Sequence, residues 1–313
     1  MSRRKYSLRD IAKVLKRSVS TISEERSRNK TRGIYDSRKA QHKAYVRRKY
    51  SKYQGMKIAH DKRLRMFVEK HLHDDQSPRA ISGRLKHYEK KLVYVSKNSI
   101  CRYIKSVNGR RIEYYRNHRQ QKRRKRRTKK TRLFDRRSIE KRPKHIEKRY
   151  RCGDVEADFV ESGKSGTGIL LVIEDRKTRS TFLEQICTVT ISRVHTAFLR
   201  IQKRFPEMKT ITTDNDILFR KHKELEKLLN VKIYFCHPYH SWEKGEIENT
   251  NRYIRRDIPK GSNISSYSRS FIEKLEQKLN RRIMECLHYK TPSEILQEVR
   301  KRRLKCRGKT RRH

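Results

Sequence analysis

Hydrophobic positions in the second half of the chain alternate between strand and helix periods. Residues 155–160 (VEADFV) alternate apolar and acidic side chains, which predicts a strand with Glu156 and Asp158 on one face and the apolar side chains on the other. The apolar face consists of Val155, Ala157 and Phe159. The later pattern predicts strands at Ile169–Glu174, Thr181–Ile186, Lys209–Thr213 and Val231–Cys236, and helices at Ile191–Phe205, at Leu218–Leu229, within His237–Gly261 and around Phe271, Leu275 and Leu279. This order predicts an α/β domain of the ribonuclease H type, with a five-stranded mixed sheet and covering helices.

The helix within His237–Gly261 has a polar face with a specific composition. Glu248, Asn251, Arg252 and Arg255 fall at i, i+3, i+4 and i+7 and therefore share one side of the helix. A carboxylate beside an amide and two guanidiniums suits a site that holds a metal ion and a phosphate backbone. The same spacing also fits a solvated face with ordinary charge pairs. Glu246 points about 200° away from Glu248 and has no obvious metal role.

The N-terminal region predicts short helices. Leu8, Ile11, Ala12 and Leu15 mark one helix, and after a break at Lys16–Arg17, Ser18 or Ser20 can cap a second helix with Val19 and Ile22 inward. Such a helix-turn-helix would offer four side chains of its second helix to the major groove, although any helical hairpin fits the pattern. These four are Ser20, Thr21, Ser23 and Arg26.

A second pair of helices is predicted at Ser77–Lys86 and Val95–Val107. Ser77 and Ser96 stand at the cap positions, and Ile100, Tyr103 and Ile104 form an inner face. The sequence therefore predicts an all-α N-terminal region with two helix-turn-helix units. Two units in tandem would read a longer DNA site than either alone.

Charge indicates the partner. The chain of 313 residues has 86 Lys and Arg against 34 Asp and Glu, a formal charge of +52, which implies a polyanionic partner. Apolar runs are too short for a membrane span, and the N-terminus lacks the apolar core of a signal peptide. The six cysteines are scattered without a CxxC pair, so neither a zinc site nor a disulfide framework is indicated. We therefore expect a reduced, cytoplasmic protein. Its partner is nucleic acid, the ribosome or an anionic membrane, and nucleic acid is favoured because the sequence shows neither a lipid anchor nor a clear amphipathic membrane helix.

Two basic runs frame the predicted domains. Lys122–Arg132 has nine basic residues in eleven and Arg300–His313 has nine in fourteen, and both are expected to be disordered. Between DNA-binding units, such a linker would contact phosphates and make affinity salt-dependent. The predicted domains are residues 1–60 and 61–108 (helix-turn-helix), 109–138 (basic linker), 139–298 (catalytic core) and 299–313 (basic tail).

Three carboxylates occupy informative positions in this arrangement. Asp158 lies on the first strand, Asp214 at the end of the fourth, and Glu248 on the helix after the fifth. Each alone is more often a surface group, but neighbouring central strands and a crossing helix can bring the three together. Carboxylates held close repel unless cations neutralise them. Two Mg²⁺ ions about 4 Å apart, with Mn²⁺ able to substitute, would do so and would support in-line phosphoryl transfer.

Several motifs resemble the IS30 family of bacterial insertion-sequence transposases, a branch of the DDE transposase and retroviral integrase superfamily. The resemblance covers nearly the whole chain. Its motifs are IEKRP (139–143), VEADFV, EDRKTR (174–179), residues 234–261, NRR (280–282) and KTPSEIL (290–296), with N-terminal counterparts at Ala12–Glu25 and Val95–Ile104. The resemblance implies that Asp158, Asp214 and Glu248 are the catalytic metal ligands and that Arg255 is the family's basic residue one heptad after the glutamate. The chain departs from the family at Val155, Ala157, Asp216 and Leu218. Asp216 stands where the family usually has glycine, and an aspartate can adopt a positive φ more readily than most residues.

The resemblance also implies an activity. A transposase of this kind binds the terminal inverted repeats of its element, cleaves a strand to free a 3′-hydroxyl, and joins that hydroxyl to target DNA as a homo-oligomer. The resemblance further implies a nucleoid-associated protein that acts on double-stranded DNA, with no RNA or membrane partner. Asn251, Arg252 and Arg255 would position the DNA. The alternative is a catalytically inactive DNA-binding protein that represses its own element, and metal-dependent nicking of end-containing DNA separates the two.

Overall fold

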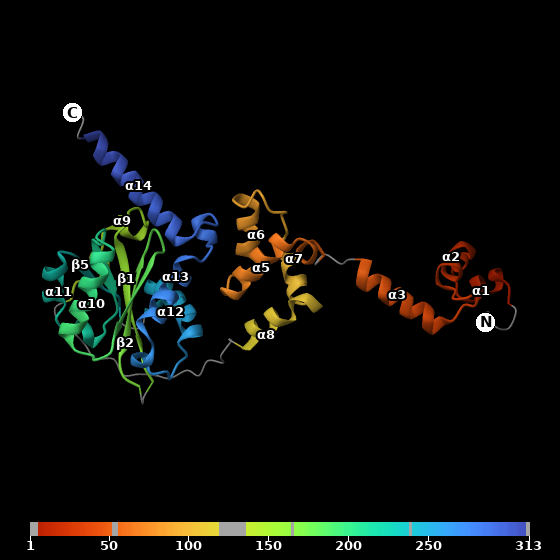
Figure 1. Ribbon diagram of the computed structural model, residues 1–313, viewed down its shortest axis with the longest axis horizontal. Coiled ribbons are helices and arrows are strands. Elements are labelled where there is room, and N and C mark those ends of the chain that lie inside the picture. Colours follow the sequence, from red (N-terminus) through yellow and green to blue (C-terminus); the bar gives the residue numbers. More distant parts are fainter. Residues whose placement is uncertain (1–5, 52–55, 119–135, 164–165, 238–239, 311–313) are drawn as a thin grey trace.

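A five-stranded mixed sheet forms the centre of the C-terminal domain (Figure 1). The computed structural model describes residues 6–51, 56–118, 136–163, 166–237 and 240–310. The strands are β1 (Asp154–Glu161), β2 (Ile169–Asp175), β3 (Thr181–Ile186), β4 (Thr210–Thr213) and β5 (Lys232–Phe235). Their order is β3-β2-β1-β4-β5, in which β1–β2 and β2–β3 pair antiparallel while β1–β4 and β4–β5 pair parallel. This is the predicted ribonuclease H-type arrangement.

Helices cover both faces of the sheet, because β2 buries apolar residues on both of its sides. The first hydrophobic cluster joins Val155, Ala157 and the apolar side of α10 (Ile191–Arg204) and α11 (His222–Leu229). The second cluster joins Val160, Leu170 and Val172 with the buried residues of α12 (Gly245–Asp257) and α13 (Arg269–Asn280). Since side chains alternate along β1, Glu156 and Asp158 lie on the α12 side. The predicted assignment of the β1 faces is confirmed.

One prediction at the end of β4 is corrected. The helix expected at Leu218–Leu229 begins only at His222, because Ile217–Phe219 form a separate 3₁₀ turn. Asp216 has φ −74° rather than a positive φ, and its Oδ1 accepts a hydrogen bond of 2.9 Å from the Leu218 amide. A short polar side chain that caps the next turn gives the segment its direction without a left-handed residue.

The expected disorder of the basic tail is also wrong for its first part. Helix α14 (Pro292–Thr310) extends through this region and projects away from the core (Figure 1). Its first half packs through Leu296 and Val299 on the sheet cluster, and Arg300 Nε contacts Glu207 Oε1 at 2.9 Å. An anchored first half lets the helix continue. The linker run Lys122–Arg132 lies outside the described residues, so its predicted disorder stays a prediction.

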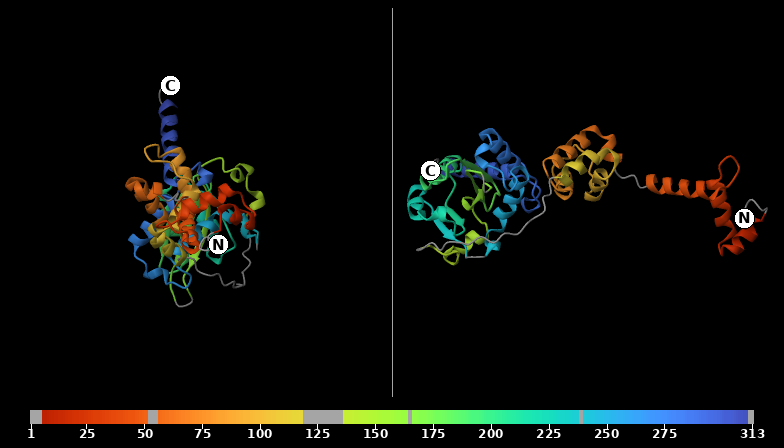
Figure 2. Two further views of the ribbon diagram at one scale, coloured as in Figure 1. Left: turned by 90° about the vertical axis from the view of Figure 1, so that its right-hand side faces the viewer. Right: turned by 90° about the horizontal axis from the view of Figure 1, so that it is seen from below.

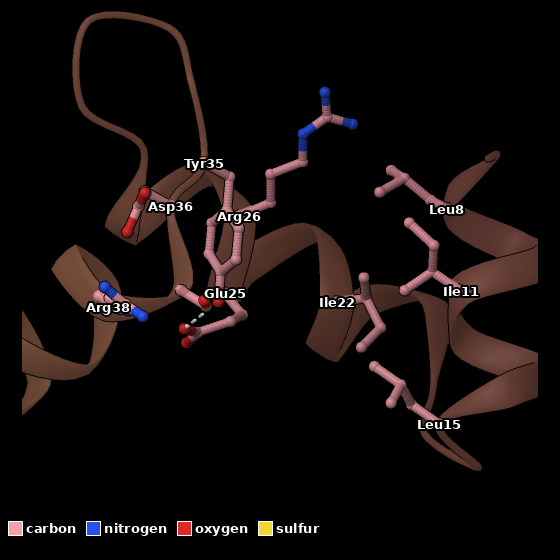
Figure 3. Close-up of a pocket in the computed structure, with 10 residues that line it drawn as sticks. Leu8, Ile11, Leu15, Ile22, Glu25, Arg26, Tyr35, Asp36 and Arg38 are labelled. Carbon is pink, nitrogen blue, oxygen red and sulfur yellow. Dashed lines mark hydrogen bonds between the residues drawn. The ribbon is translucent and has the colours of Figure 1, made fainter. Parts of the chain in front are cut away.

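The N-terminal helices α1 (Leu8–Val14) and α2 (Val19–Asn29) form the predicted pair, with Ser18 as the cap of α2. Lys16 in the turn has φ +50°, the left-handed conformation for which such turns often use glycine. Val19 is 42% exposed and Leu15 is 53% exposed, so Val19 does not point inward as predicted. Instead, apolar side chains line an open cavity of about 610 Å³ between α1, α2 and the start of α3 (Ser37–Ser51) (Figure 3).

A second helical group lies between α3 and the core (Figures 1 and 2). It consists of α4 (Met56–His60), α5 (Lys62–His73), α6 (Pro78–His87), α7 (Lys97–Ile104) and α8 (Arg110–His118). Ser77 caps α6 and Ser96 caps α7, as predicted. Ile58 of α4 and Ile112 of α8 share one cluster with Ile100 and Tyr103, so the packed unit includes helices on both sides of the predicted 61–108 segment.

Helix α6 of this group rests on the segment that joins α13 to α14 and on the first turn of α14. Arg84 donates to both carboxylate oxygens of Glu294 at 2.7 and 2.8 Å, and Gln76 Oε1 accepts a hydrogen bond from the Ile283 amide at 3.2 Å. A Cβ on Gly83 would lie 2.1 Å from the Tyr289 ring, so only glycine permits this approach. These contacts, with Lys278 between Asp75 and Asp257, form what we call the α6 seat.

Short helical segments complete the described chain: 3₁₀ turns at Val107–Gly109, Ile139–Lys141, Ser241–Lys244, Ile264–Ser266 and Glu285–Leu287, and α9 (Lys144–Glu147). Within the described ranges, no helix has both the length and the apolar character that crossing a membrane requires.

Candidate active site

Two of the three predicted carboxylates meet at the sheet. Asp158 lies on β1 and Asp214 directly follows β4, the parallel neighbour of β1. A single ammonium lies between them: Lys244 Nζ is 3.2 Å from Asp158 Oδ1 and 3.5 Å from Asp214 Oδ1. Neighbouring strands thus hold the aspartates within reach of one cation, as their places in the chain predicted.

Lys244 is buried, with 9% of its side chain exposed, and immediately precedes α12. Burial by itself lowers the pKa of this lysine, but the negative charges of Asp158 and Asp214 raise the pKa above its ordinary value. Burial raises the pKa of Asp158 and the nearby Asp214 adds to this, while Lys244 opposes the rise. The pair is therefore a partly exposed anionic site in which the buried Lys244 supplies the balancing positive charge.

Helix α12 presents its predicted polar residues in different directions. Asn251 Nδ2 donates to Asp158 Oδ2 at 2.7 Å, so this amide orients the aspartate. Glu248 and Arg252 are exposed, and Arg252 donates to Asn249 at 2.6 Å. Arg255 donates to the backbone oxygen of Glu161 at 2.8 Å. The helix register agrees with the prediction, since Ile247 and Ile254 are both fully buried.

The donor chemistry at the aspartates fits a divalent cation. Among the described residues, no three His, Cys, Asp or Glu side chains are grouped so that they could hold a metal ion, so Glu248 is not gathered with the aspartates. Yet both carboxylates already converge on a cation, the Lys244 ammonium. The buried Oδ1 of Asn251, beside Asp158, has no hydrogen-bond partner in the described part of the chain. Oxygen donors of this kind are those that Mg²⁺ prefers.

A buried ionic network fixes α12 on the sheet, and sequence reasoning missed it. Glu156 Oε2 accepts a hydrogen bond from the Ile247 amide in the first turn of α12, and Glu156 Oε1 pairs with Arg176 at 3.3 Å. Glu246 forms ion pairs with Arg149 and Arg179. Glu246 is thus an anchor of α12.

Glu174 belongs to the same buried region. Burial raises its pKa to about 7, while a hydrogen bond from Thr250 of α12 and the charges of Arg179 and Arg282 act in the opposite direction. Burial also lowers the pKa of Arg282. Several residues of the motifs at Glu174–Arg179 and Asn280–Arg282 therefore form a buried group beside α12. Their role is to hold this helix on the sheet.

The predicted DNA-contacting residues of the first helical pair are accessible. Ser20, Thr21, Ser23 and Arg26 are all exposed on α2. The hydroxyls of Ser20 and Thr21 lie 2.9 and 2.7 Å from that of Ser18, the cap of the helix. Their role in DNA contact stays a prediction.

Known proteins resemble this chain over most of its length. It is 34% identical over 299 residues to the transposase for insertion sequence element IS4351 from Bacteroides fragilis, a match that covers 92% of this chain and 89% of that protein. It is 29% identical over 309 residues to the transposase InsI for IS30A from Escherichia coli K12, covering 94% and 79%. The transposase for IS1086 from Cupriavidus metallidurans is 29% identical over 308 residues, covering 94% and 89%.

Solved structures resemble the core more distantly. The catalytic core domain of BIV integrase is 17% identical, and the match covers 49% of this chain and 98% of that one with a TM-score of 0.38. The HTLV-2 integrase catalytic core domain in complex with magnesium is 19% identical, covering 44% and 92% with a TM-score of 0.34. No protein-family model matches the chain.

Proposed function

The chain belongs to the IS30 family of insertion-sequence DNA transposases, and we propose that it cleaves and joins DNA at a divalent-metal site formed by Asp158, Asp214 and Glu248. One observation carries the proposal: the two aspartates of neighbouring parallel strands share a single cation, at 3.2 and 3.5 Å, directly before the helix that bears Glu248. The relatives are transposases, which does not favour the alternative of an inactive repressor.

Each protein group has a defined task in this proposal. Asp158, Asp214 and Glu248 would hold the ions, and Mg²⁺ or Mn²⁺, when bound, neutralises charge on the reacting phosphate. Asn251 keeps Asp158 in one orientation, because its amide donates to Oδ2 at 2.7 Å. Exposed Arg252 and half-buried Arg255 are suited to phosphate oxygens, which guanidinium groups bind well.

The reaction has two steps. Water attacks a phosphodiester at the end of the element, and the departing oxygen becomes a free 3′-hydroxyl. That hydroxyl then attacks a target phosphodiester, so one phosphorus–oxygen bond forms as another breaks, with no covalent link to the protein. The helical groups would bind the terminal inverted repeats, and paired ends require a homo-oligomer on DNA in the bacterial cytoplasm.

The test is cleavage of a labelled inverted-repeat duplex in Mg²⁺ or Mn²⁺, with DNA binding measured in parallel. Asp158→Asn, Asp214→Asn and Glu248→Gln should bind DNA as the parent does and yield no cleaved strand. Asp257→Asn is a matched control, since Asp257 lies at the far end of α12 and contacts Lys278 at 3.1 Å. Parental cleavage rates in any of the three site variants would refute the assignment of that residue.

A further inference from the structure

The positive charge between the two site aspartates belongs to the protein itself. We propose that Lys244 is a built-in counter-ion that holds Asp158 and Asp214 together before metal binds, and that it competes with the incoming divalent ion for them. This inference rests on the proposed function, because it assumes that the aspartates are metal ligands. It adds Lys244 as a positioning residue, a role that the sequence motifs did not assign to it.

The geometry supports a shared counter-ion rather than an incidental contact. Lys244 Nζ reaches one oxygen of each aspartate, at 3.2 and 3.5 Å, and only 9% of the lysine side chain is exposed. Two carboxylates held close together repel unless a proton or a cation lies between them. The ammonium supplies that cation, so the two strands can keep their carboxylates together without an ion from solution.

The ammonium and a divalent ion cannot use the same oxygens at the same time. Mg²⁺ binds carboxylate oxygen at roughly 2.0–2.1 Å, well inside the space that the ammonium occupies between the two aspartates. Two cations that close together would also repel each other. Metal binding therefore requires Lys244 to leave the aspartates, and its lost ion pairs reduce the apparent affinity for metal.

The position of Lys244 in the chain links this exchange to the third carboxylate. Lys244 is the residue before α12, and Glu248 follows four residues later, one helical turn away. In the structure the lysine is buried at the aspartates while Glu248 is exposed. Until the ions bind, Lys244 is therefore the charged residue of this segment that contacts the two aspartates, and Glu248 is not.

The experiment measures Mn²⁺ binding to the full-length protein without DNA, by electron paramagnetic resonance and by the metal-induced rise in melting temperature. Lys244→Gln should bind Mn²⁺ at least about 10-fold more tightly, because an attractive competitor charge has been removed. Lys244→Arg keeps the charge and should stay near the parental affinity. Lys278→Gln is the matched control, since Lys278 also bridges two aspartates, Asp75 and Asp257, at 3.1 Å each.

Melting temperatures give a second readout. Without metal, both Lys→Gln variants should melt below the parent because each leaves two carboxylates without their shared cation. Saturating Mn²⁺ should restore Lys244→Gln and leave Lys278→Gln low.

The outcomes separate this inference from the proposed function. Unchanged or weaker Mn²⁺ affinity in Lys244→Gln, or an equal gain in Lys244→Arg, would overturn the role of Lys244, provided that Asp158→Asn abolishes binding. If the Asp158→Asn and Asp214→Asn variants both bind Mn²⁺ as the parent does, the metal site itself is misassigned, and the proposed function falls together with the inference.

Discussion

Two glutamates two residues apart in α12 should respond oppositely to the same substitution. Glu246 is 16% exposed and pairs with Arg149 and Arg179, of which Arg179 is 10% exposed and Arg149 is 46% exposed. Glu246→Gln removes the negative charge between two guanidiniums that stay in place. Loss of one partner of a buried pair costs ~3–5 kcal/mol, and the exposure of Arg149 reduces this to about 2–3 kcal/mol.

That cost translates into a melting temperature roughly 5–10 °C below the parent for a domain of this size. Glu248→Gln replaces an exposed side chain and should change stability by no more than about 0.5 kcal/mol. Catalysis should show the reverse order. At a temperature where both variants are folded, Glu248→Gln should give no cleaved strand, and Glu246→Gln should retain substantial cleavage.

Differential scanning fluorimetry and cleavage of a labelled inverted-repeat duplex measure the two effects on the same preparations. DNA binding is assayed in parallel, so that a lost substrate is not mistaken for lost chemistry. If Glu246→Gln melts like the parent but does not cleave, while Glu248→Gln melts low and cleaves normally, the roles of the two residues are exchanged and the reasoning fails.

Three further predictions follow from other parts of the chain. A fragment of residues 1–118, which holds both helical groups, should shift inverted-repeat DNA in preference to random duplex at moderate salt, and equal affinity for both would contradict the recognition role. Because burial raises the pKa of Glu174 from 4.5 to about 7, the native state binds this proton more tightly than the unfolded chain, and stability falls as pH rises between those values. Glu174→Gln should therefore gain melting temperature relative to the parent at pH 8 but not at pH 4.5, and a pH-independent difference would exclude the effect. Arg84→Glu should release α6 from its seat and speed hydrogen exchange in α6. The double variant Arg84→Glu/Glu294→Arg should return exchange to the parental rate, with a coupling free energy between the two residues of about 1 kcal/mol, a value reduced for the 38% exposure of Glu294. If exchange stays fast in the double variant, this ion pair does not hold α6 on the C-terminal domain.

Local sequence patterns predicted the elements of the core because each strand and helix buries a face of its own. The alternation in residues 155–160 placed Asp158 opposite the apolar face of β1, and the apolar run before Asp214 placed that residue at a strand end. Chain order alone then brought the two aspartates to neighbouring strands. No comparable local signal exists for Lys244, whose contact with Asp158 spans 86 residues and depends on the path of the chain into α12.

The same limit applies to the buried ion pairs. Glu246 meets Arg149 and Arg179 from distant segments, each with a left-handed φ that nothing in its neighbourhood predicts. Val19 was expected inward from its apolar character, yet a pair of short helices has too little surface to cover every apolar side chain, and Val19 stays 42% exposed. Tertiary contacts between remote segments decide these details, and periodicity carries no information about them.

The α6 seat limits which helical groups the C-terminal domain can accept. Exchange of the helical groups for those of a relative would bring a new α6 against Tyr289 and Glu294, which now match Gly83 and Arg84. A chimera joined in the linker would therefore need the residues between α13 and α14 to be exchanged as well. By contrast, Lys97, Asn98 and Arg102 of α7 are exposed and take no part in the α6 seat, so they can be varied without removing its contacts.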